Sequence, residues 1–284
     1  MKYVNPRKIY HYKLLDSCLR MKQSKVYDHY DDEVKIYGST AQCTMPDLFI
    51  RNLEIKKILS SIQNLSKEKT SSLKILEIGC GNGYVLEKIS KKIKAEYTGV
   101  DINKKMIDLA KKRNLKNVTF LVDDILKTKL KSNTFDVIFT ERCLINLLDW
   151  KMQKKSIVQI HKLLKKNSYY IMLEGFEDGL KKLNSARNSL GLENINSAWH
   201  NLYFKKKQLE NEIKGKFVNG MNKNSKVVYD NFLSSYYFGS RVLYPALISK
   251  KSKIQYNNSF IEFFSMGESV GNYSPLQLCI LKKF

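Results

Sequence analysis

The sequence predicts an α/β fold, with a doubly wound and mostly parallel sheet, helices on both faces and helical cap insertions. Short apolar runs alternate with helical segments from residue 73 onward. This alternation is typical of buried parallel strands joined by crossover helices. A glycine-rich turn directly follows the first apolar run. Sheets of this kind bind their ligands at the carboxyl ends of the strands.

The first 70 residues are polar and rich in tyrosine, and they end in a helical pattern from Asp47 through Leu65. We expect residues 1–70 to form an N-terminal helical lid, which the polar linker Ser66–Ser72 closes. No internal repeat or low-complexity linker divides residues 71–284, so we expect them to form one domain.

Five apolar runs predict the strands of the domain core, residues 73–175. These runs are Leu73–Ile78, Ala95–Val100, Val118–Val122, Phe135–Thr140 and Tyr169–Leu173. Three segments between them have the length of crossover helices, namely Gly83–Lys92, Lys104–Arg113 and Lys151–Leu164. The segment Leu164–Tyr170 is expected to be the loop before the fifth strand.

Residues 176–284 are expected to supply a substrate cap and the last strands. The pattern indicates a helix at Lys205–Ile213, a strand at Lys216–Met221, an inserted helical cap at Tyr229–Leu247 and a last strand at Leu276–Lys282.

The chain carries a formal charge of +23, from 50 Lys and Arg against 27 Asp and Glu. Only seven of the 50 basic residues are Arg, and the basic residues are spread along the whole sequence. Proteins that read bases or phosphates favour Arg for its bidentate geometry. The charge therefore favours solvated surfaces, and nucleic acid is a possible partner that the pattern does not favour.

Hydrophobic residues make up 43% of the chain, as in an ordinary globular protein. The longest run without charge, Ser269–Leu281, is shorter than the roughly 18 residues of a membrane span. The N-terminus has no apolar signal segment, and the five cysteines show no paired metal-type spacing. We expect a cytoplasmic protein with reduced cysteines and without a metal site or a membrane span.

The strongest motif is Ile75–Tyr84, ILEIGCGNGY, a strand that runs into a glycine turn and then a helix. Glycines let the backbone turn tightly and approach a ligand. Asp101 ends the next predicted strand, where a carboxylate can accept ribose hydroxyl protons, and Asp123-Asp124-Ile125 ends the third, where an acid can accept from an adenine amino group. Three neighbouring strand ends thus predict a nucleoside ligand.

A dinucleotide is disfavoured, because its turn reads G-x-G-x-x-G whereas this turn reads G-x-G-x-G. Glu77, two residues before the first glycine, would repel phosphates but attract a positively charged amino group of a ligand.

These residues resemble the class I S-adenosylmethionine-dependent methyltransferases over about Leu73–Leu173, with Phe135–Asn146 similar to the fourth motif. The resemblance implies a Rossmann-like, seven-stranded sheet and S-adenosylmethionine as cofactor. The cofactor-binding residues that it implies, with their neighbours, are Glu77, Gly79, Cys80, Gly81, Gly83, Asp101, Ile102, Asp123, Asp124, Ile125, Glu141 and Arg142. The chain lacks the Pro-Gly-Gly that the family commonly has before the fifth strand, which bears on turn geometry more than on activity.

Segments beyond the core, such as Glu174–Asn184 and Trp199–Phe204, are similar to a subgroup of small-molecule methyltransferases often linked to glycan or cell-surface biosynthesis. The candidate catalytic residues are His200, Glu174 and Glu141. His200 could remove a proton from the acceptor or be a structural histidine, and Glu174 could serve the acceptor or cap a helix. Candidate substrate-binding residues are Tyr27, Tyr30, Arg51, Asn146, Asn201 and Arg241.

We therefore expect an enzyme that transfers a methyl group to an O or N atom of a small polar acceptor, with anionic molecules and sugars as candidates. An RNA methyltransferase is one alternative, although the sequence shows no RNA-binding module and has Thr140–Cys143 in place of an N-P-P-Y tetrad. A noncatalytic cofactor-binding subunit is the other alternative, and it predicts a degraded glycine turn.

Overall fold

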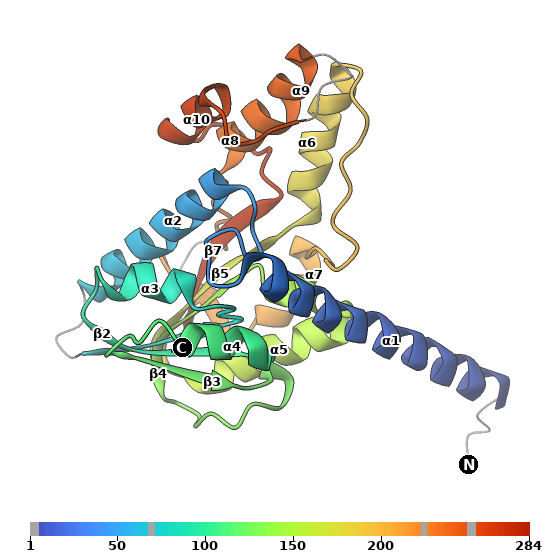
Figure 1. Cartoon of the computed structure of the whole chain (residues 1–284). Coiled ribbons are helices and arrows are strands. Elements are labelled where there is room, and N and C mark those ends of the chain that lie inside the picture. Colours follow the sequence, from blue (N-terminus) through green and yellow to red (C-terminus); the bar gives the residue numbers. More distant parts are fainter. Residues whose placement is uncertain (1–5, 68–71, 223–225, 249–253) are drawn as a thin grey trace.

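The computed structural model describes residues 6–67, 72–222, 226–248 and 254–284, with the side chains described from residue 21 onward. A seven-stranded sheet with the order β3-β2-β1-β4-β5-β7-β6 forms its centre (Figure 1). The strands are β1 Leu73–Ile78, β2 Ala95–Asp101, β3 Val118–Val122, β4 Phe135–Glu141, β5 Leu164–Gly175, β6 Phe217–Asn219 and β7 Leu276–Lys283. Strands β1 to β5 pair in parallel, and β7 runs antiparallel to both β5 and β6.

The two faces of the sheet pack into two separate hydrophobic clusters. Alternate residues of one strand belong to different clusters, with Val137 and Phe139 of β4 on one side and Ile138 on the other. This alternation follows from the period of two along a strand. The strands are apolar on both faces because helices cover both.

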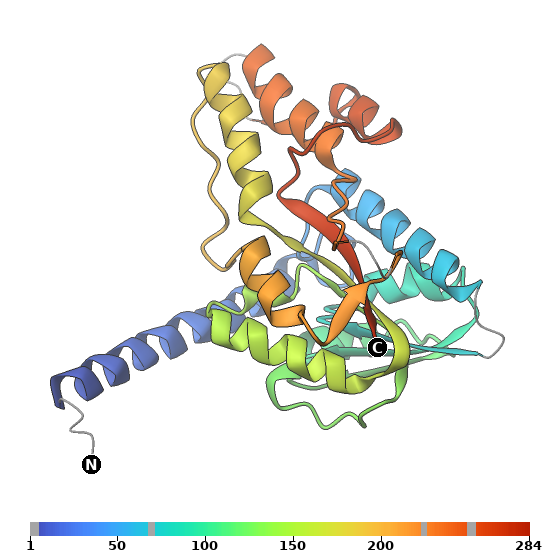
Figure 2. The same ribbon diagram turned by 180° about the vertical axis from the view of Figure 1, so that it is seen from behind.

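The helices α2 Leu48–Ser66, α3 Tyr84–Ser90 and α4 Lys104–Lys111 cover one face, and α5 Trp150–Leu163 and α7 Lys206–Ile213 cover the other (Figure 2). Side chains at the N-caps begin three of these helices. The carboxylates of Asp47 and Asp149 and the amide oxygen of Asn103 accept backbone N–H groups of α2, α5 and α4, respectively.

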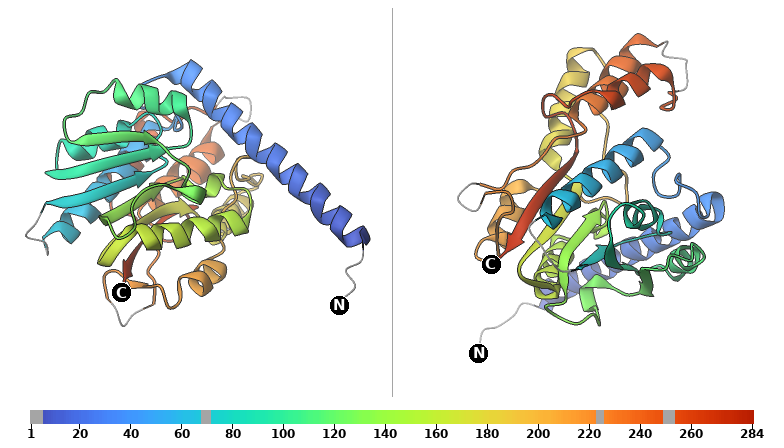
Figure 3. Two further views of the ribbon diagram at one scale, coloured as in Figure 1. Left: turned by 90° about the horizontal axis from the view of Figure 1, so that it is seen from below. Right: turned by 90° about the vertical axis from the view of Figure 1, so that its left-hand side faces the viewer.

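A long N-terminal helix, α1 Pro6–Tyr37, extends away from the sheet at its N-terminal end (Figure 3). Its C-terminal half packs beside α4 and the carboxyl ends of the strands. The turn after α1 is fastened to the core by Asn82, whose side-chain amide donates to the carbonyls of Gly38 and Thr40, each at 3.0 Å.

The cap consists of helices inserted around β6 and β7. It contains α6 Glu177–Ser189, α8 Ser234–Phe238, a π-helical turn Gly239–Leu243, α9 Tyr244–Leu247 and α10 Ser259–Met266, which gather above the sheet in Figure 1. Arg241 in the π-helical turn joins this cap to the start of α2 through an ion pair with Asp47 at 2.7 Å.

The structure confirms the predicted α/β fold and places the five core strands at or within a few residues of the expected bounds. Three expectations need correction. The segment Leu164–Tyr170 is part of β5 rather than a loop, and the pairing of β4 with β5 shifts register between Phe135 and Val137 to absorb it. The predicted cap helix at Tyr229–Leu247 begins only at Ser234. Helix α6 was not expected, because its polar sequence shows little apolar periodicity. Most of the expected linker Ser66–Ser72 lies outside the described residues.

Candidate active site

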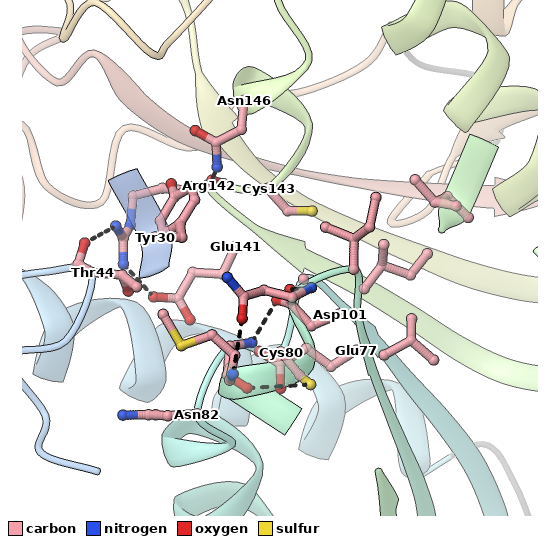
Figure 4. Close-up of a pocket in the computed structure, with 18 of the residues that line it drawn as sticks. Tyr30, Thr44, Glu77, Cys80, Asn82, Asp101, Glu141, Arg142, Cys143 and Asn146 are labelled. Carbon is pink, nitrogen blue, oxygen red and sulfur yellow. Dashed lines mark hydrogen bonds and ion pairs between the residues drawn. The ribbon is translucent and has the colours of Figure 1, made fainter. Parts of the chain in front are cut away.

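A pocket lies where the carboxyl ends of β1, β2 and β4 meet the C-terminal half of α1 (Figure 4). The open space in the pocket and at its mouth, solvent included, amounts to about 1110 Å³. The cofactor-site residues of the sequence analysis that line it are Glu77, Gly79, Cys80, Gly81, Asp101, Ile102, Asp123, Asp124, Ile125, Glu141 and Arg142. The pocket is also lined by Tyr27, Tyr30, Arg51 and Asn146 from the predicted substrate set.

The glycine turn forms the floor of the pocket, and each of its three glycines has a positive φ. A Cβ on Gly79 would lie 2.4 Å from Sγ of Cys143, so the turn and the segment after β4 approach closely here. A Cβ on Gly83 would meet the Phe120 ring at 2.8 Å, which makes Gly83 a packing residue at the start of α3 rather than part of the pocket wall. Gly81 faces open space, with Sδ of Met106 4.0 Å away.

Asp101 at the end of β2 is fixed by the backbone on both sides. Its Oδ2 accepts the N–H of Gly81 at 2.9 Å, and its Oδ1 accepts the N–H of Asn103 at 2.8 Å. Burial raises the pKa of this carboxyl, although the backbone N–H groups oppose the shift. The carboxylate therefore keeps one orientation at the edge of the pocket, with lone pairs left for a ligand.

The turn after β3 places a second pair of acids beside Asp101, whose carbonyl accepts the N–H of Asp123 at 3.0 Å. Asp124 accepts the N–H of Leu126 at 2.9 Å, and Asp123 accepts from the hydroxyl of Thr128. Tyr27 of α1 stands near Asp124, and burial together with this negative charge raises the pKa of Tyr27. Asp124 and Ile125 thus form a wall that α1 covers.

Two arginines and three glutamates form a buried ion cluster beside the glycine turn. Arg142 donates to Glu54 at 2.9 Å and to Glu141 at 3.0 Å, and Arg51 donates to Glu141 at 3.2 Å. Glu77, the third glutamate, is 1% exposed and makes no ion pair within the described part of the chain. Burial, followed by the negative charge of Glu141, raises the pKa of Glu77 well above its usual value.

Arg142 has a left-handed backbone conformation, with φ of +52°. This conformation is uncommon for residues other than glycine, and it is held here by the bond from the Arg142 N–H to the Leu173 carbonyl at 2.9 Å. The guanidinium also donates to the carbonyl of Thr44 at 3.1 Å. Arg142 therefore ties the end of β4 to α2 and to the turn before it.

Helix α1 closes the pocket through a few polar contacts. The side chain of Gln23 donates to the Asn146 carbonyl at 3.0 Å and accepts the Leu148 N–H at 3.2 Å. Tyr30 stands over the pocket near Arg142 and Asn146 (Figure 4), and burial raises the pKa of its phenol. The amide of Asn146 itself donates to the Arg142 carbonyl at 3.0 Å.

Four predicted residues besides Gly83 lie outside the pocket lining. Glu174 is fully buried, and its carboxylate accepts the backbone N–H groups of Cys143, Leu144 and Ile145, which begin the short 3₁₀ helix η2 Leu144–Asn146. This geometry favours the capping alternative for Glu174. Burial raises its pKa to about 7, against these hydrogen bonds. Arg241 belongs to the cap, and Asn201 lies in the loop before α7.

His200 lies in an aromatic cluster next to the pocket. Its ring stacks on His29 of α1 with centroids 4.4 Å apart, and Trp199 and Tyr30 contact the pair edge-on or tilted. The Nδ1 atom of His200 is buried without a hydrogen-bond partner among the described residues. Burial, then the charge of His29, lowers the pKa of His200 to about 4.

Sequence reasoning did not single out several residues that shape the site. Glu54 belongs to the ion cluster. Asn82 donates hydrogen bonds that fix the turn after α1, and Gln23 makes hydrogen bonds that fix the loop after β4. The position of Asn82 between two motif glycines was a usable signal. The partners of Glu54 and Gln23 lie 88 and 123 residues away in the sequence, so no local spacing indicated these two contacts.

Among the described residues, no group of three or more His, Cys, Asp or Glu could hold a metal ion. None of the described helices is both long and apolar enough to cross a membrane. The side chains of Cys43, Cys80, Cys143 and Cys279 are free thiols.

Comparison with known proteins places the chain in a family. A family model described as a methyltransferase domain matches residues 69–222, more than half of the 284 residues. The malonyl-[acyl-carrier protein] O-methyltransferase of Bacillus cereus is 43% identical over 90 residues, which are 30% of this chain and 33% of that protein. The phosphoethanolamine N-methyltransferase of Plasmodium falciparum is 33% identical over 94 residues, 32% of this chain and 34% of that protein. The matches span about a third of the length of these curated relatives.

Among solved structures, a plantazolicin methyltransferase, BpumL, in complex with a pentazolic desmethylPZN analog and SAH is similar over nearly the whole chain. The TM-score is 0.56 at 20% identity, with 94% of this chain and 97% of that chain covered, which shows a shared fold. The chain therefore belongs to the methyltransferase domain family, with the class I fold and the cofactor S-adenosylmethionine that characterise it.

Proposed function

We propose that this protein transfers a methyl group from S-adenosylmethionine to an O or N atom of a small polar acceptor, a metabolite or a sugar. One observation carries the proposal. In a chain of charge +23, the pocket lining includes five carboxyl groups, two arginines and no lysine among the described residues. An acidic pocket in a basic protein suits a ligand with net positive charge.

The residues of the pocket fit the cofactor. Gly81 leaves space for a ligand at the turn, and Asp101 is oriented to accept from ribose hydroxyls. Asp124 and Ile125 suit the adenine ring. The Oε2 atoms of Glu77 and Glu141 are buried without hydrogen-bond partners among the described residues. Such atoms are costly unless a ligand satisfies them, and a methionine ammonium group would do so.

The protein's own task in this reaction is modest. The sulfonium of S-adenosylmethionine supplies an electrophilic methyl group, so the protein must align the acceptor, exclude water and accept one proton. Tyr30 and Asn146 line the pocket on the side of the end of β4, and His200 contacts Tyr30 from outside with its ring centroid 6.1 Å away. The lowered pKa of about 4 keeps His200 neutral near pH 7, and its Nδ1 has no partner among the described residues, but the same shift makes the imidazole a weaker base.

Residues 1–70 act in this proposal as a lid over the bound cofactor. Gln23, Tyr27 and Tyr30 of α1 all contribute to the pocket wall. Opening of α1 would admit the ligands, and its closure would exclude water. We also place the protein in the cytoplasm, on the basis of its cysteine composition and free thiols.

The relatives do not select the acceptor, because their names point to a carrier-bound malonyl group, phosphoethanolamine and an azole compound. An RNA acceptor is less well supported, since none of the described lysines lines the pocket. The intact glycine turn argues against a noncatalytic subunit.

The test has two steps. Calorimetric titration with S-adenosylmethionine is expected to show one site per chain, and absence of binding would reject the enzyme. Metabolite extract and RNA are then incubated separately with methyl-labelled cofactor, and mass spectrometry locates the label. We expect label in small metabolites, whereas label chiefly in RNA would overturn the choice of acceptor.

A further inference from the structure

The buried ion cluster contains more carboxyl groups than guanidinium groups. Arg142 pairs with Glu54 and Glu141, and Arg51 pairs with Glu141, whereas the nearby Glu77 makes no ion pair among the described residues. The side chains of Glu54, Glu141 and Arg51 are between 0% and 6% exposed, so water cannot screen the excess negative charge. A buried charge without compensation is expensive, and such a group takes up a proton instead.

The positions of Glu54 and Glu141 on one guanidinium point to this pair as the holder of that proton. Each glutamate places its Oε1 on Arg142, while each Oε2 is buried and receives no hydrogen from the described residues. Because both carboxyl groups bind the same guanidinium, they lie side by side, with two buried acceptor atoms that no described residue donates to. A proton on one of the two carboxyl groups would supply the missing donor and remove their mutual repulsion.

One proton also makes the charges of the cluster equal. Three carboxyl groups with one proton carry two negative charges, which match the two guanidinium groups. Glu77 lines the pocket wall, where a ligand reaches it, whereas Glu54 lies behind the wall and is 0% exposed. Tyr237 of α8 also faces Glu54, and burial raises the pKa of this phenol well above its usual value, so Tyr237 adds no charge.

We propose that Glu54 and Glu141 share one proton in the empty protein, and that a cation bound in the adjacent pocket drives this proton into solvent. The proposal rests on the proposed function, because S-adenosylmethionine carries one positive charge more than S-adenosylhomocysteine. Glu54 is then a positioning residue that acts through Glu141 and lets the site distinguish the charged cofactor from the neutral product.

The physical reason is electrostatic. Glu141 lines the pocket, so a sulfonium there stabilises the doubly ionised form of the pair. After transfer of the methyl group the sulfonium becomes a neutral thioether, the pair takes a proton back, and affinity for the product falls. Burial raises the pKa of Glu54 well above its usual value, and the two arginines lower that of Glu141, in agreement with a proton held mainly on Glu54.

The test is calorimetric titration of the full chain with S-adenosylmethionine and with S-adenosylhomocysteine, in buffers of different ionisation enthalpy, between pH 5.5 and 7.5. Binding of S-adenosylmethionine is expected to release up to one proton, and its Kd to fall by up to about tenfold per pH unit as the pH rises. The Kd of S-adenosylhomocysteine is expected to change much less.

The variant Glu54→Gln keeps the hydrogen bonds of the protonated acid but has no proton to release. It is expected to lose the release of a proton and the pH dependence, and to bind S-adenosylmethionine more weakly without weaker binding of S-adenosylhomocysteine. Glu212→Gln is the matched control, because Glu212 is 7% exposed, pairs with Lys154 and Lys216 of α5 and the turn after α7, and lies outside the pocket. It is expected to behave as the wild type.

Infrared difference spectra of the wild-type protein give an independent readout if Glu54→Gln does not fold. The carbonyl band of a protonated carboxylic acid is expected in the free protein and is expected to disappear on addition of S-adenosylmethionine. Binding without release of a proton, or release that persists in Glu54→Gln, would overturn the proposal. If S-adenosylmethionine did not bind, the proposed function would fail, and absence of the band in the free protein would separately refute the shared proton.

Discussion

Asp101 accepts the backbone N–H of Gly81 at 2.9 Å, and this bond joins the end of β2 to the glycine turn after β1. The two residues are 20 positions apart in the sequence. They meet because β1 and β2 are neighbouring parallel strands, whose carboxyl ends lie at the same edge of the sheet. One carboxylate thus orders the turn and faces the ligand.

The variant Asp101→Asn tests this double role. The N–H₂ group of the new amide would face one of the two backbone N–H donors and could not accept from it. The substitution would also remove the charged acceptor for a ribose. We expect S-adenosylmethionine to bind about 10- to 150-fold more weakly, the equivalent of about 1.5–3 kcal/mol for a hydrogen bond to a charged group. Calorimetry measures the change. Asp108→Asn, in an exposed ion pair with Lys104, should bind like the wild type.

Gly79 and Gly215 offer a matched pair of glycines with φ of +78° and +76°. A Cβ on Gly79 would clash with Cys143, whereas a Cβ on Gly215 meets nothing within 4 Å. We expect Gly215→Ala to cost about 1 kcal/mol of unfolding free energy, from the left-handed conformation alone. Gly79→Ala should cost about 1–3 kcal/mol more, from overpacking, and should lose cofactor binding. Urea unfolding compares the two, and equal costs would show that the close approach at Gly79 is unimportant.

The sequence predicted the sheet well, and it predicted that the motif glycines and the strand-end acids meet at one edge of the sheet, because both depend on local patterns. Apolar runs located the strands, and the motif glycines and strand-end acids required only that neighbouring strands be parallel. The contacts that α1 and α2 make with the core were not predicted. The contacts of Glu54 with Arg142 and of Gln23 with Asn146 depend on how α1 and α2 pack on the core, which no local spacing encodes.

The variant Glu174→Gln separates the two roles considered for this residue. The carboxylate accepts three backbone N–H groups at the start of η2, at 3.0 to 3.2 Å. The N–H₂ group of an amide would face one of these backbone N–H donors and could not accept from it. We therefore expect a loss of about 1–3 kcal/mol of unfolding free energy. Thermal or urea unfolding measures this loss. A catalytic role instead predicts unchanged stability with a large fall in kcat.

The stacked pair of His29 and His200 predicts how stability depends on pH. The pKa of His200 is lowered from 6.5 to about 4, so below pH 6.5 the unfolded chain binds a proton that the folded chain does not. The stability of the fold should therefore decrease as the pH falls from about 6.5 toward 4. Urea midpoints at pH 7 and pH 5 measure this, and His200→Gln should lose less stability than the wild type over the same interval. An equal loss in both proteins would assign the effect to other groups.

The same variant tests whether His200 takes part in the reaction. A proton acceptor that touches the acceptor molecule predicts a fall in kcat with an unchanged Kd for S-adenosylmethionine. If His200 only fastens α1, we expect a higher Kd for S-adenosylmethionine with an unchanged kcat. A looser lid weakens retention of the cofactor, whereas the chemistry in the closed state is unaffected. Gln23→Ala is the matched comparison, since Gln23 also fastens α1 but through Asn146 and Leu148. If His200→Gln and Gln23→Ala show the same kinetic pattern, His200 serves the lid; if only His200→Gln lowers kcat, it serves the proton transfer.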